Sequence, residues 1–226
     1  VRGLLKKTGS DTRYIRDEHR AERASDLVRE AMLQALDQAE MAPADIDLLI
    51  YCGVGKGFIE PANAYFYAQS IGLTCSCFDI ADACMSWMRA LEIAYTFLGS
   101  GRIRSAMIIN GEFNYKEHGY PENFDIKSLE QLEYTFPTYT IGEAATATIV
   151  TASESEWQFD YHSVPDLCSL CNIPMSGYED FVEPSDRIAL NGVSNFVAYG
   201  HELFARAEQY LLPLLRRVVG DLNAPD

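Results

Sequence analysis

The sequence predicts an α/β fold built around a parallel sheet. Amphipathic helical segments alternate along the chain with short, nearly continuous apolar runs, and strands that are buried on both faces have this apolar character. The chain has 226 residues, of which 48% are hydrophobic, enough to bury a sizeable core. We therefore expect helices to cover both faces of a sheet.

The first half of the chain carries most of these elements. Ser25 is expected to cap a helix that runs to about Glu40, because apolar residues recur there three and four positions apart. Pro61 favours the start of a short helix that ends at Gly72, since glycine accepts the left-handed conformation of a helix C-cap. Four apolar runs are expected to be strands, at 46–52, 77–80, 105–111 and 144–150.

Further helices are expected on either side of the last of these strands. One runs from Cys84 to Leu98, where glycines follow. Another runs from Val193 towards Gln209. Pro213 is expected to begin a separate helix, because proline in a helix interior costs about 3 kcal/mol.

Composition excludes several classes of partner. The formal charge is −15, with 18 Lys and Arg against 33 Asp and Glu, and nucleic-acid binding needs clustered basic residues. No apolar run approaches the ~20 residues that span a bilayer, and the N-terminal segment lacks the apolar core of a signal peptide. Several of the six cysteines lie in apolar runs, as reduced cysteines do. We expect a cytoplasmic protein with neither nucleic acid nor membrane as a partner.

Cys84 is the candidate catalytic residue. It stands where an apolar strand gives way to an amphipathic helix, so that its thiol lies at a helix N-terminus. Unsatisfied N–H groups and the positive end of the helix dipole favour the thiolate at such a position. A thiolate is the nucleophile that thioester chemistry needs. A buried, inert cysteine is the alternative for any single thiol.

Two other motifs carry little weight. Cys168 and Cys171 have the spacing of a zinc or redox pair, but no second pair follows at the spacing of a zinc finger. We expect no metal site. The glycine-rich segment 53–57 lacks the Gly-Lys-Ser/Thr ending of a phosphate-binding loop, and is expected to be a tight loop at the end of a strand.

Five short motifs follow one another along the chain. They are Thr12-Arg13-Tyr14-Ile15, Ala44-Asp45-Ile46-Asp47-Leu48-Leu49-Ile50, Glu60-Pro61-Ala62-Asn63-Ala64, Phe78-Asp79-Ile80-Ala81-Asp82-Ala83-Cys84, and Ile141-Gly142-Glu143-Ala144-Ala145-Thr146-Ala147. The motif that ends at Cys84 is the specific one, and the others are informative through their order. Together they resemble the β-ketoacyl-acyl carrier protein synthase III branch of the thiolase superfamily.

This resemblance implies a thiolase-like, five-layered αβαβα fold whose first half is nearly complete and whose second half is partial. The domains would be residues 1–157, which hold the nucleophilic cysteine, and residues 158–226, the start of the C-terminal half. The family's first strand would precede Val1, and its catalytic His and Asn would follow Asp226.

The implied activity is that of an acyltransferase of the 3-oxoacyl synthase III type, in fatty acid, polyketide or other secondary-metabolite synthesis. An acyl group would pass from a coenzyme A or acyl carrier protein thioester to Cys84, and a decarboxylative Claisen-type condensation would follow. The thioester is the substrate, and no cofactor or metal is implied.

Two departures from the family pattern concern the site. Met85-Ser86-Trp87 follows the cysteine where the family has a small residue and Gly-Phe, and Glu143 replaces an aspartate. Alternatives therefore stay open: an acyltransferase that forms an ester or amide, or a non-catalytic subunit that pairs with an active paralogue. We also expect a homodimer, or a heterodimer with a paralogue, formed by pairing of the strand at 105–111 across a two-fold axis.

Overall fold

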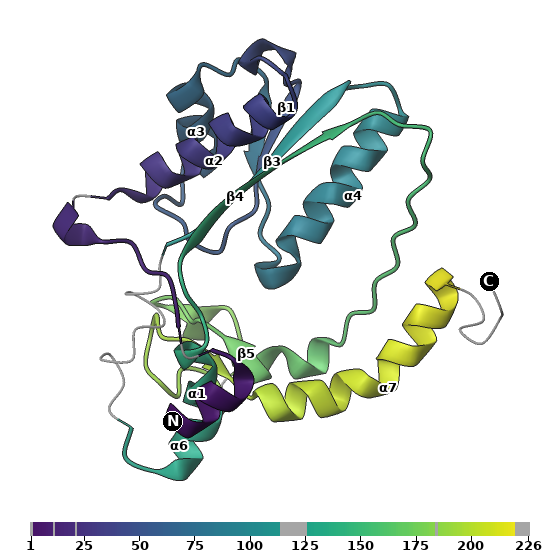
Figure 1. Ribbon diagram of the computed structural model, residues 1–226. Helices are drawn as coiled ribbons and strands as arrows, with labels where there is room; N and C mark the ends of the chain where they lie inside the picture. The colour runs from purple at the N-terminus through teal and green to yellow at the C-terminus, as the bar shows by residue number, and fades with distance from the viewer. Residues whose placement is uncertain (1, 11, 21, 114–125, 184, 220–226) are drawn as a thin grey trace. The chain divides into compact units, whose positions relative to one another are not determined.

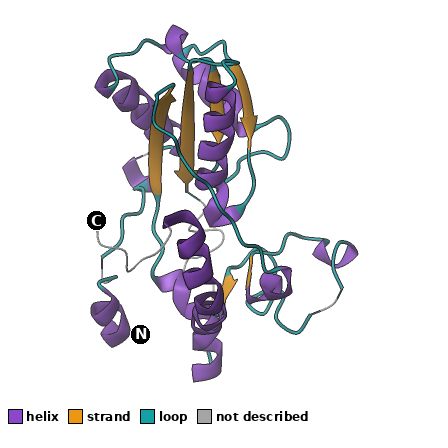
Figure 2. Cartoon of the chain, turned by 90° about the vertical axis from the view of Figure 1, so that its right-hand side faces the viewer, coloured by secondary structure: helices purple, strands orange, loops and turns teal. Residues whose placement is uncertain are grey.

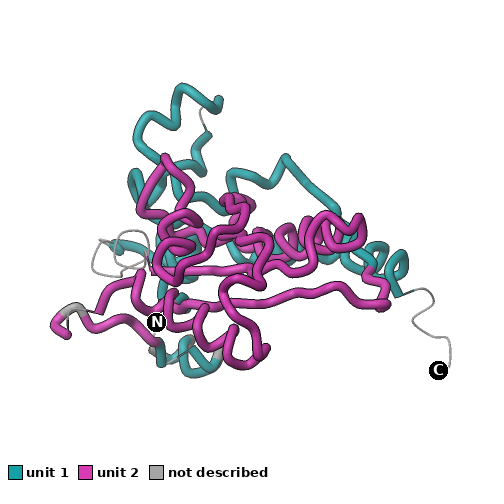
Figure 3. Tube along the Cα trace, turned by 90° about the horizontal axis from the view of Figure 1, so that it is seen from above, with its two compact units in different colours: residues 1–13, 115–141, 158–226 teal, residues 14–114, 142–157 magenta. Residues whose placement is uncertain are grey.

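The computed structural model describes residues 2–10, 12–20, 22–113, 126–183 and 185–219. Contacts divide the chain into two compact units, each assembled from separate segments (Figure 3). One unit consists of residues 14–114 and 142–157, and the other of residues 1–13, 115–141 and 158–226. The division expected from the sequence, between residues 157 and 158, stays a prediction, and residues 114–125 and 220–226 lie outside the described part.

The unit formed by residues 14–114 and 142–157 contains a four-stranded mixed sheet in the order β2-β1-β3-β4. β1 pairs in parallel with β2 and with β3, and β3 pairs with β4 in antiparallel fashion. All four strands come from runs that the sequence marks as apolar. Their bounds are Leu48–Tyr51 for β1, Ser76–Asp79 for β2, Ser105–Glu112 for β3 and Ala144–Thr151 for β4.

Helices cover both faces of this sheet (Figures 1 and 2). α2 (Ala24–Gln38) and α3 (Asn63–Ile71) lie on one face, and α4 (Ser86–Gly99) lies on the other. α4 buries a stripe of Ala90, Leu91, Ala94 and Leu98, whose spacing of three and four places them on one side of the helix. The expected α/β architecture is therefore present, with the sheet as the middle one of three layers and helices on either side.

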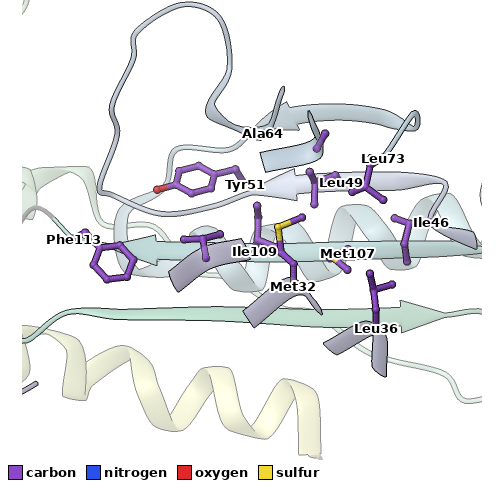
Figure 4. Packing of buried hydrophobic residues seen from close by; sticks show 12 residues of the cluster. Met32, Leu36, Ile46, Leu49, Tyr51, Ala64, Leu73, Met107, Ile109 and Phe113 are labelled. Carbon is purple, nitrogen blue, oxygen red and sulfur yellow. The ribbon is translucent and has the colours of Figure 1, made fainter. Parts of the chain in front are cut away.

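The core lies between the sheet and the pair α2 and α3 (Figure 4). Alternate residues of a strand face opposite sides of a sheet, so Leu49 and Tyr51 of β1 and Met107 and Ile109 of β3 point to the same layer. α2 contributes Val28, Met32 and Leu36, all buried. Burying each such side chain stabilises the fold by about 1.5–3 kcal/mol.

The second unit holds short elements and one long helix. α1 (Arg2–Thr8), α6 (Leu129–Thr135) and α7 (Gly200–Val219) are its helices within the described residues, and β5 (Cys171–Asn172) pairs with β6 (Val197–Ala198) in antiparallel fashion. Short 3-10 turns connect them at Phe136–Tyr139, Pro165–Leu170 and Tyr178–Asp180. None of the helices in the described part of the chain combines the length and apolar character that crossing a membrane requires.

Two expectations about the sheet are wrong. The sheet is not wholly parallel, because β4 runs against β3. β3, which covers the run at 105–111, is also an inner strand with neighbours on both sides, so its edge cannot pair with a second copy. An apolar run indicates that both faces of a strand are buried. Burial alone does not show whether the strand is an inner or an edge strand, or in which direction it runs.

Several element ends also differ from expectation. α2 begins at Ala24 after Arg23, which makes no side-chain capping hydrogen bond, so Ser25 lies within the helix and does not cap it. α7 is a single helix that contains Pro213, where two helices were expected. The end of α3 agrees with expectation, since Gly72 adopts the left-handed conformation with φ of 75°.

Candidate active site

Cys84 lies in the turn between β2 and α4, with its side chain exposed. β2 ends at Asp79, a 3-10 turn spans Ala83–Met85, and α4 begins at Ser86. The cysteine therefore precedes the first turn of α4 and is not its first residue. The N-terminal N–H groups of a helix favour a negative charge placed ahead of them, which is where the sequence places the thiol.

The turn around Cys84 is tightly closed. The backbone N–H of Met85 donates to the carbonyl oxygen of Asp82 at 2.9 Å, and the N–H of Asp82 donates to the Ser86 hydroxyl oxygen at 2.8 Å. Ser86 is buried. Ala83, directly before the cysteine, has φ of 44°, a region that costs a non-glycine residue free energy and persists only where surrounding contacts hold it.

Asp79 ties the end of β2 to the start of α3. One carboxylate oxygen accepts hydrogen bonds from the backbone N–H and the side-chain amide of Asn63, at 2.9 and 3.0 Å, and the other accepts from the N–H of Ala64 at 3.0 Å. Ala62, at the N-cap position, has no side chain that could do this. The sequence analysis did not identify this role, although an acid at the end of an apolar strand is a signal that could have found it.

The glycine-rich segment 53–57 is held at the carboxyl end of β1. The Glu112 carboxylate accepts hydrogen bonds from the N–H groups of Val54 at 2.9 Å and Gly55 at 3.1 Å. The buried Tyr51 hydroxyl lies between the carbonyl oxygens of Gly55 and Gly111, 3.0 Å from the latter. Burial, and secondarily neighbouring charges that include Glu112, raise the pKa of Tyr51. This hydroxyl therefore stays protonated and serves the loop as a hydrogen-bond donor.

The other cysteines of this unit have less reactive surroundings. Burial raises the pKa of Cys52 to about 11, and the Glu112 carboxylate adds to the effect. Burial is also the main cause that raises the pKa values of Cys75 and Cys77. Because the thiolate is the nucleophile, these three thiols are poor candidates for catalysis, and Cys84 is the exposed thiol of this unit.

Glu143 is a buried acid that sequence reasoning treated only as a departure from the family pattern. Its carboxylate accepts a hydrogen bond from the N–H of Arg16 at 2.8 Å and lies 3.8 Å from the Arg16 guanidinium, and its own N–H donates to the Tyr14 carbonyl oxygen. A cavity of about 330 Å³ adjoins this contact, and Cys84 is not among the residues that line it. The acid thus joins residues 14–16 to the start of β4.

Cys168 and Cys171 lie in the other unit, within the 3-10 turn Pro165–Leu170 and at the start of β5, and both are exposed. The described residues contain no group of three or more His, Cys, Asp and Glu side chains placed to hold a metal ion.

Comparison with known proteins finds distant relatives of this chain. No family model matches the chain. It is 27% identical over 214 residues to β-ketoacyl-[acyl-carrier-protein] synthase III of Campylobacter jejuni subsp. doylei, a match that covers 86% of this chain and 60% of that protein. The synthase III of Campylobacter fetus subsp. fetus is 28% identical over 204 residues, covering 89% of this chain and 57% of the relative. The chain thus spans about three fifths of the length of these relatives.

Solved structures show the same fold. A 3-oxoacyl-(acyl-carrier-protein) synthase III superposes with a TM-score of 0.75 at 18% identity, over 98% of this chain and 66% of that one. A cysteine-to-serine variant of OleA from Xanthomonas campestris, with bound lauric acid and lauroyl-CoA, superposes with a TM-score of 0.73 at 19% identity, over 94% and 60% of the two chains. The chain therefore has a mixed α/β, thiolase-like fold, and it is a distant homologue of the β-ketoacyl-acyl carrier protein synthases III that it matches.

Proposed function

We propose that Cys84 accepts an acyl group from a coenzyme A or acyl carrier protein thioester and passes it on in a condensation of the 3-oxoacyl synthase III type. The observation that carries the proposal is the exposed thiol in a closed turn ahead of α4, in a chain homologous to synthases of that name. The likeness to OleA with bound lauroyl-CoA supports a thioester as the substrate class.

The first step is nucleophilic. The Cys84 thiolate attacks the thioester carbonyl carbon, and the resulting tetrahedral intermediate collapses with loss of the donor thiolate, which leaves an acyl group on the sulfur. Backbone N–H groups that point at the developing oxyanion would stabilise it, and each such donor contributes about 3–4 kcal/mol in well-studied sites. The N–H of Cys84 is our candidate for this role.

The second step would join the acyl group to a malonyl unit. Decarboxylation of the malonyl thioester gives an enolate, whose carbon attacks the acyl carbonyl and releases the Cys84 thiolate. Donors that stabilise the enolate inside a dry site are needed for this step, and the resemblance assigns it to a His and an Asn. Transfer to an alcohol or amine is the alternative for the same acyl-enzyme.

Exposed apolar side chains beside the cysteine favour an acyl substrate. Met85, Trp87 and Met88 lie within the four residues after Cys84 and are 37–44% exposed. Apolar residues that border a nucleophile can shelter an alkyl chain from water, and flexible methionine side chains adapt to its shape. We propose that these residues limit the length of the acyl group.

We also propose that the protein works in the cytoplasm, as a homodimer or together with a paralogous subunit.

Mass spectrometry of the intact protein tests the acyl transfer step. After incubation with octanoyl-CoA we expect a mass gain of one acyl group, located on Cys84 by peptide mapping and absent from Cys84→Ser. Cys168→Ser, which removes an exposed thiol in the other unit, is the matched control and should retain the adduct. Turnover of the thioester without an adduct would indicate a hydrolase, and neither turnover nor adduct would indicate a non-catalytic subunit.

A further inference from the structure

Asp82 binds the chain on the far side of Cys84 through three separate groups. Its backbone carbonyl oxygen accepts from the N–H of Met85, and its backbone N–H donates to the hydroxyl oxygen of Ser86. Its carboxylate accepts a hydrogen bond from the Nε of Arg89, a residue of α4, at 2.8 Å. Asp82, which precedes the thiol, is thus joined to three residues that follow the thiol, through both its side chain and its backbone.

The carboxylate contact is an ion pair at the surface. The side chains of Asp82 and Arg89 are 46% and 34% exposed, and Arg89 also lies 3.8 Å from Glu92. Exposed pairs of this kind add about 0–1 kcal/mol to stability. Their effect on the local electrostatic potential is separate from this stabilisation, because opposite charges at hydrogen-bond distance largely cancel for a group that lies farther away than the two are from each other.

The position of this pair matters because Asp82 lies two residues before the nucleophile. A carboxylate without a counter-charge there would oppose the approach of any anionic reactant. Coenzyme A and carrier-protein thioesters carry phosphate groups. The protein already has a formal charge of −15, so an additional local anion would be unfavourable, whereas guanidinium keeps its positive charge throughout the working pH range.

We propose that Asp82 is a positioning residue for Cys84 and that Arg89 neutralises its carboxylate, so that the turn is held by an acid without becoming anionic. The role of Cys84 as the nucleophile rests on the proposed function. The neutralisation itself is a property of the turn and can be measured without any thioester.

The test compares two alkylating reagents that differ in charge. Iodoacetamide is neutral and iodoacetate is an anion, and in both reactions the thiolate sulfur displaces iodide. Second-order rate constants at Cys84 are obtained from peptide mass spectrometry at low ionic strength. We expect Arg89→Met to lower the ratio of the iodoacetate rate to the iodoacetamide rate by roughly three- to fivefold, the effect of one nearby charge in a partly screened site. Asp82→Asn combined with Arg89→Met should restore the ratio.

Three further variants separate charge from structure. Arg89→Lys keeps the charge and should keep the wild-type ratio. Arg102→Gln removes the same charge beyond the far end of α4, about 20 Å along a helix of this length, and should leave the ratio unchanged. Ser86→Ala removes the partner of the Asp82 N–H and should slow both reagents equally, as expected when the turn loosens. Thermal unfolding confirms that each variant is folded.

Several results would overturn the proposal. They are an unchanged ratio in Arg89→Met, an equal change in Arg102→Gln, or no recovery in the double variant. A protein that shows the expected ratios but forms no acyl adduct would contradict the proposed function and leave the neutralisation intact. A protein that is acylated but shows no change in the ratio would contradict the neutralisation and leave the proposed function intact.

Discussion

The carboxylate of Asp79 accepts hydrogen bonds from both the backbone N–H and the side-chain amide of Asn63, at 2.9 and 3.0 Å. These residues are 16 positions apart, at the end of β2 and the start of α3. The side-chain oxygen of Asn63 in turn accepts from the N–H of Gly57 at 3.0 Å. A single acid therefore fixes the strand that leads to Cys84, the start of α3, and the glycine-rich loop.

Replacing this acid should destabilise the unit. Asp79→Ala leaves three donors of α3 without their acceptor, and Asn63 is buried, so we expect a loss of about 2 kcal/mol in the free energy of unfolding. Urea denaturation measures it. Asp79→Asn retains an acceptor and should lose less. Equal stability of Asp79→Ala and the wild type would show that water replaces the carboxylate at no cost.

Cys84 should react first among the six cysteines. Near neutral pH we expect iodoacetamide to modify it ahead of Cys52, Cys75 and Cys77, whose raised pKa values keep them as thiols. Peptide mass spectrometry at several times gives the order, and Cys84→Ser should lose the fastest phase. The exposed thiols of Cys168 and Cys171 are the internal comparison, and labelling of either with Cys84 silent would contradict the assignment.

Gly111 should not tolerate a side chain. A Cβ at this position would lie 2.8 Å from a methyl carbon of Val28 on α2, and overpacking of this kind costs about 1–3 kcal/mol. We expect Gly111→Ala to lower the melting temperature, and Val28→Ala to be less harmful in its presence than alone, because the removed methyl groups make room. Gly99→Ala is the control, since nothing lies within 4 Å of the added carbon there. Additive effects of the two substitutions would show that no clash exists.

Acid stability should depend on Asp47. Its hydrogen bond from the Arg104 side chain, supported by the backbone N–H of Arg104, lowers the pKa of Asp47 below the ordinary value of 3.8. An acid with a lowered folded-state pKa contributes stability above its unfolded-state pKa and loses it as the pH falls through the folded-state value. We expect the stability of Asp47→Asn to fall less steeply than that of the wild type between about pH 5 and pH 2. Parallel pH curves would contradict this.

The sequence determined the local elements and the candidate nucleophile. Apolar periodicity predicted α2, α4 and the four strands, because side-chain spacing along the chain decides which face can be buried. Gly72 marked the end of α3, since a left-handed C-cap is a local property of glycine. Cys84 stood out because its neighbours in the sequence are also its neighbours in the turn.

Features that depend on long-range contacts were decided only by the tertiary structure. The antiparallel direction of β4 and the inner position of β3 depend on how segments far apart in the chain assemble, and an apolar run is the same in either case. The capping of α3 by Asp79 and the joining of Glu143 to Arg16 bring together residues 15 and 127 positions apart. Each partner satisfies a polar group that folding removes from water, and that requirement exists only once the chain has folded.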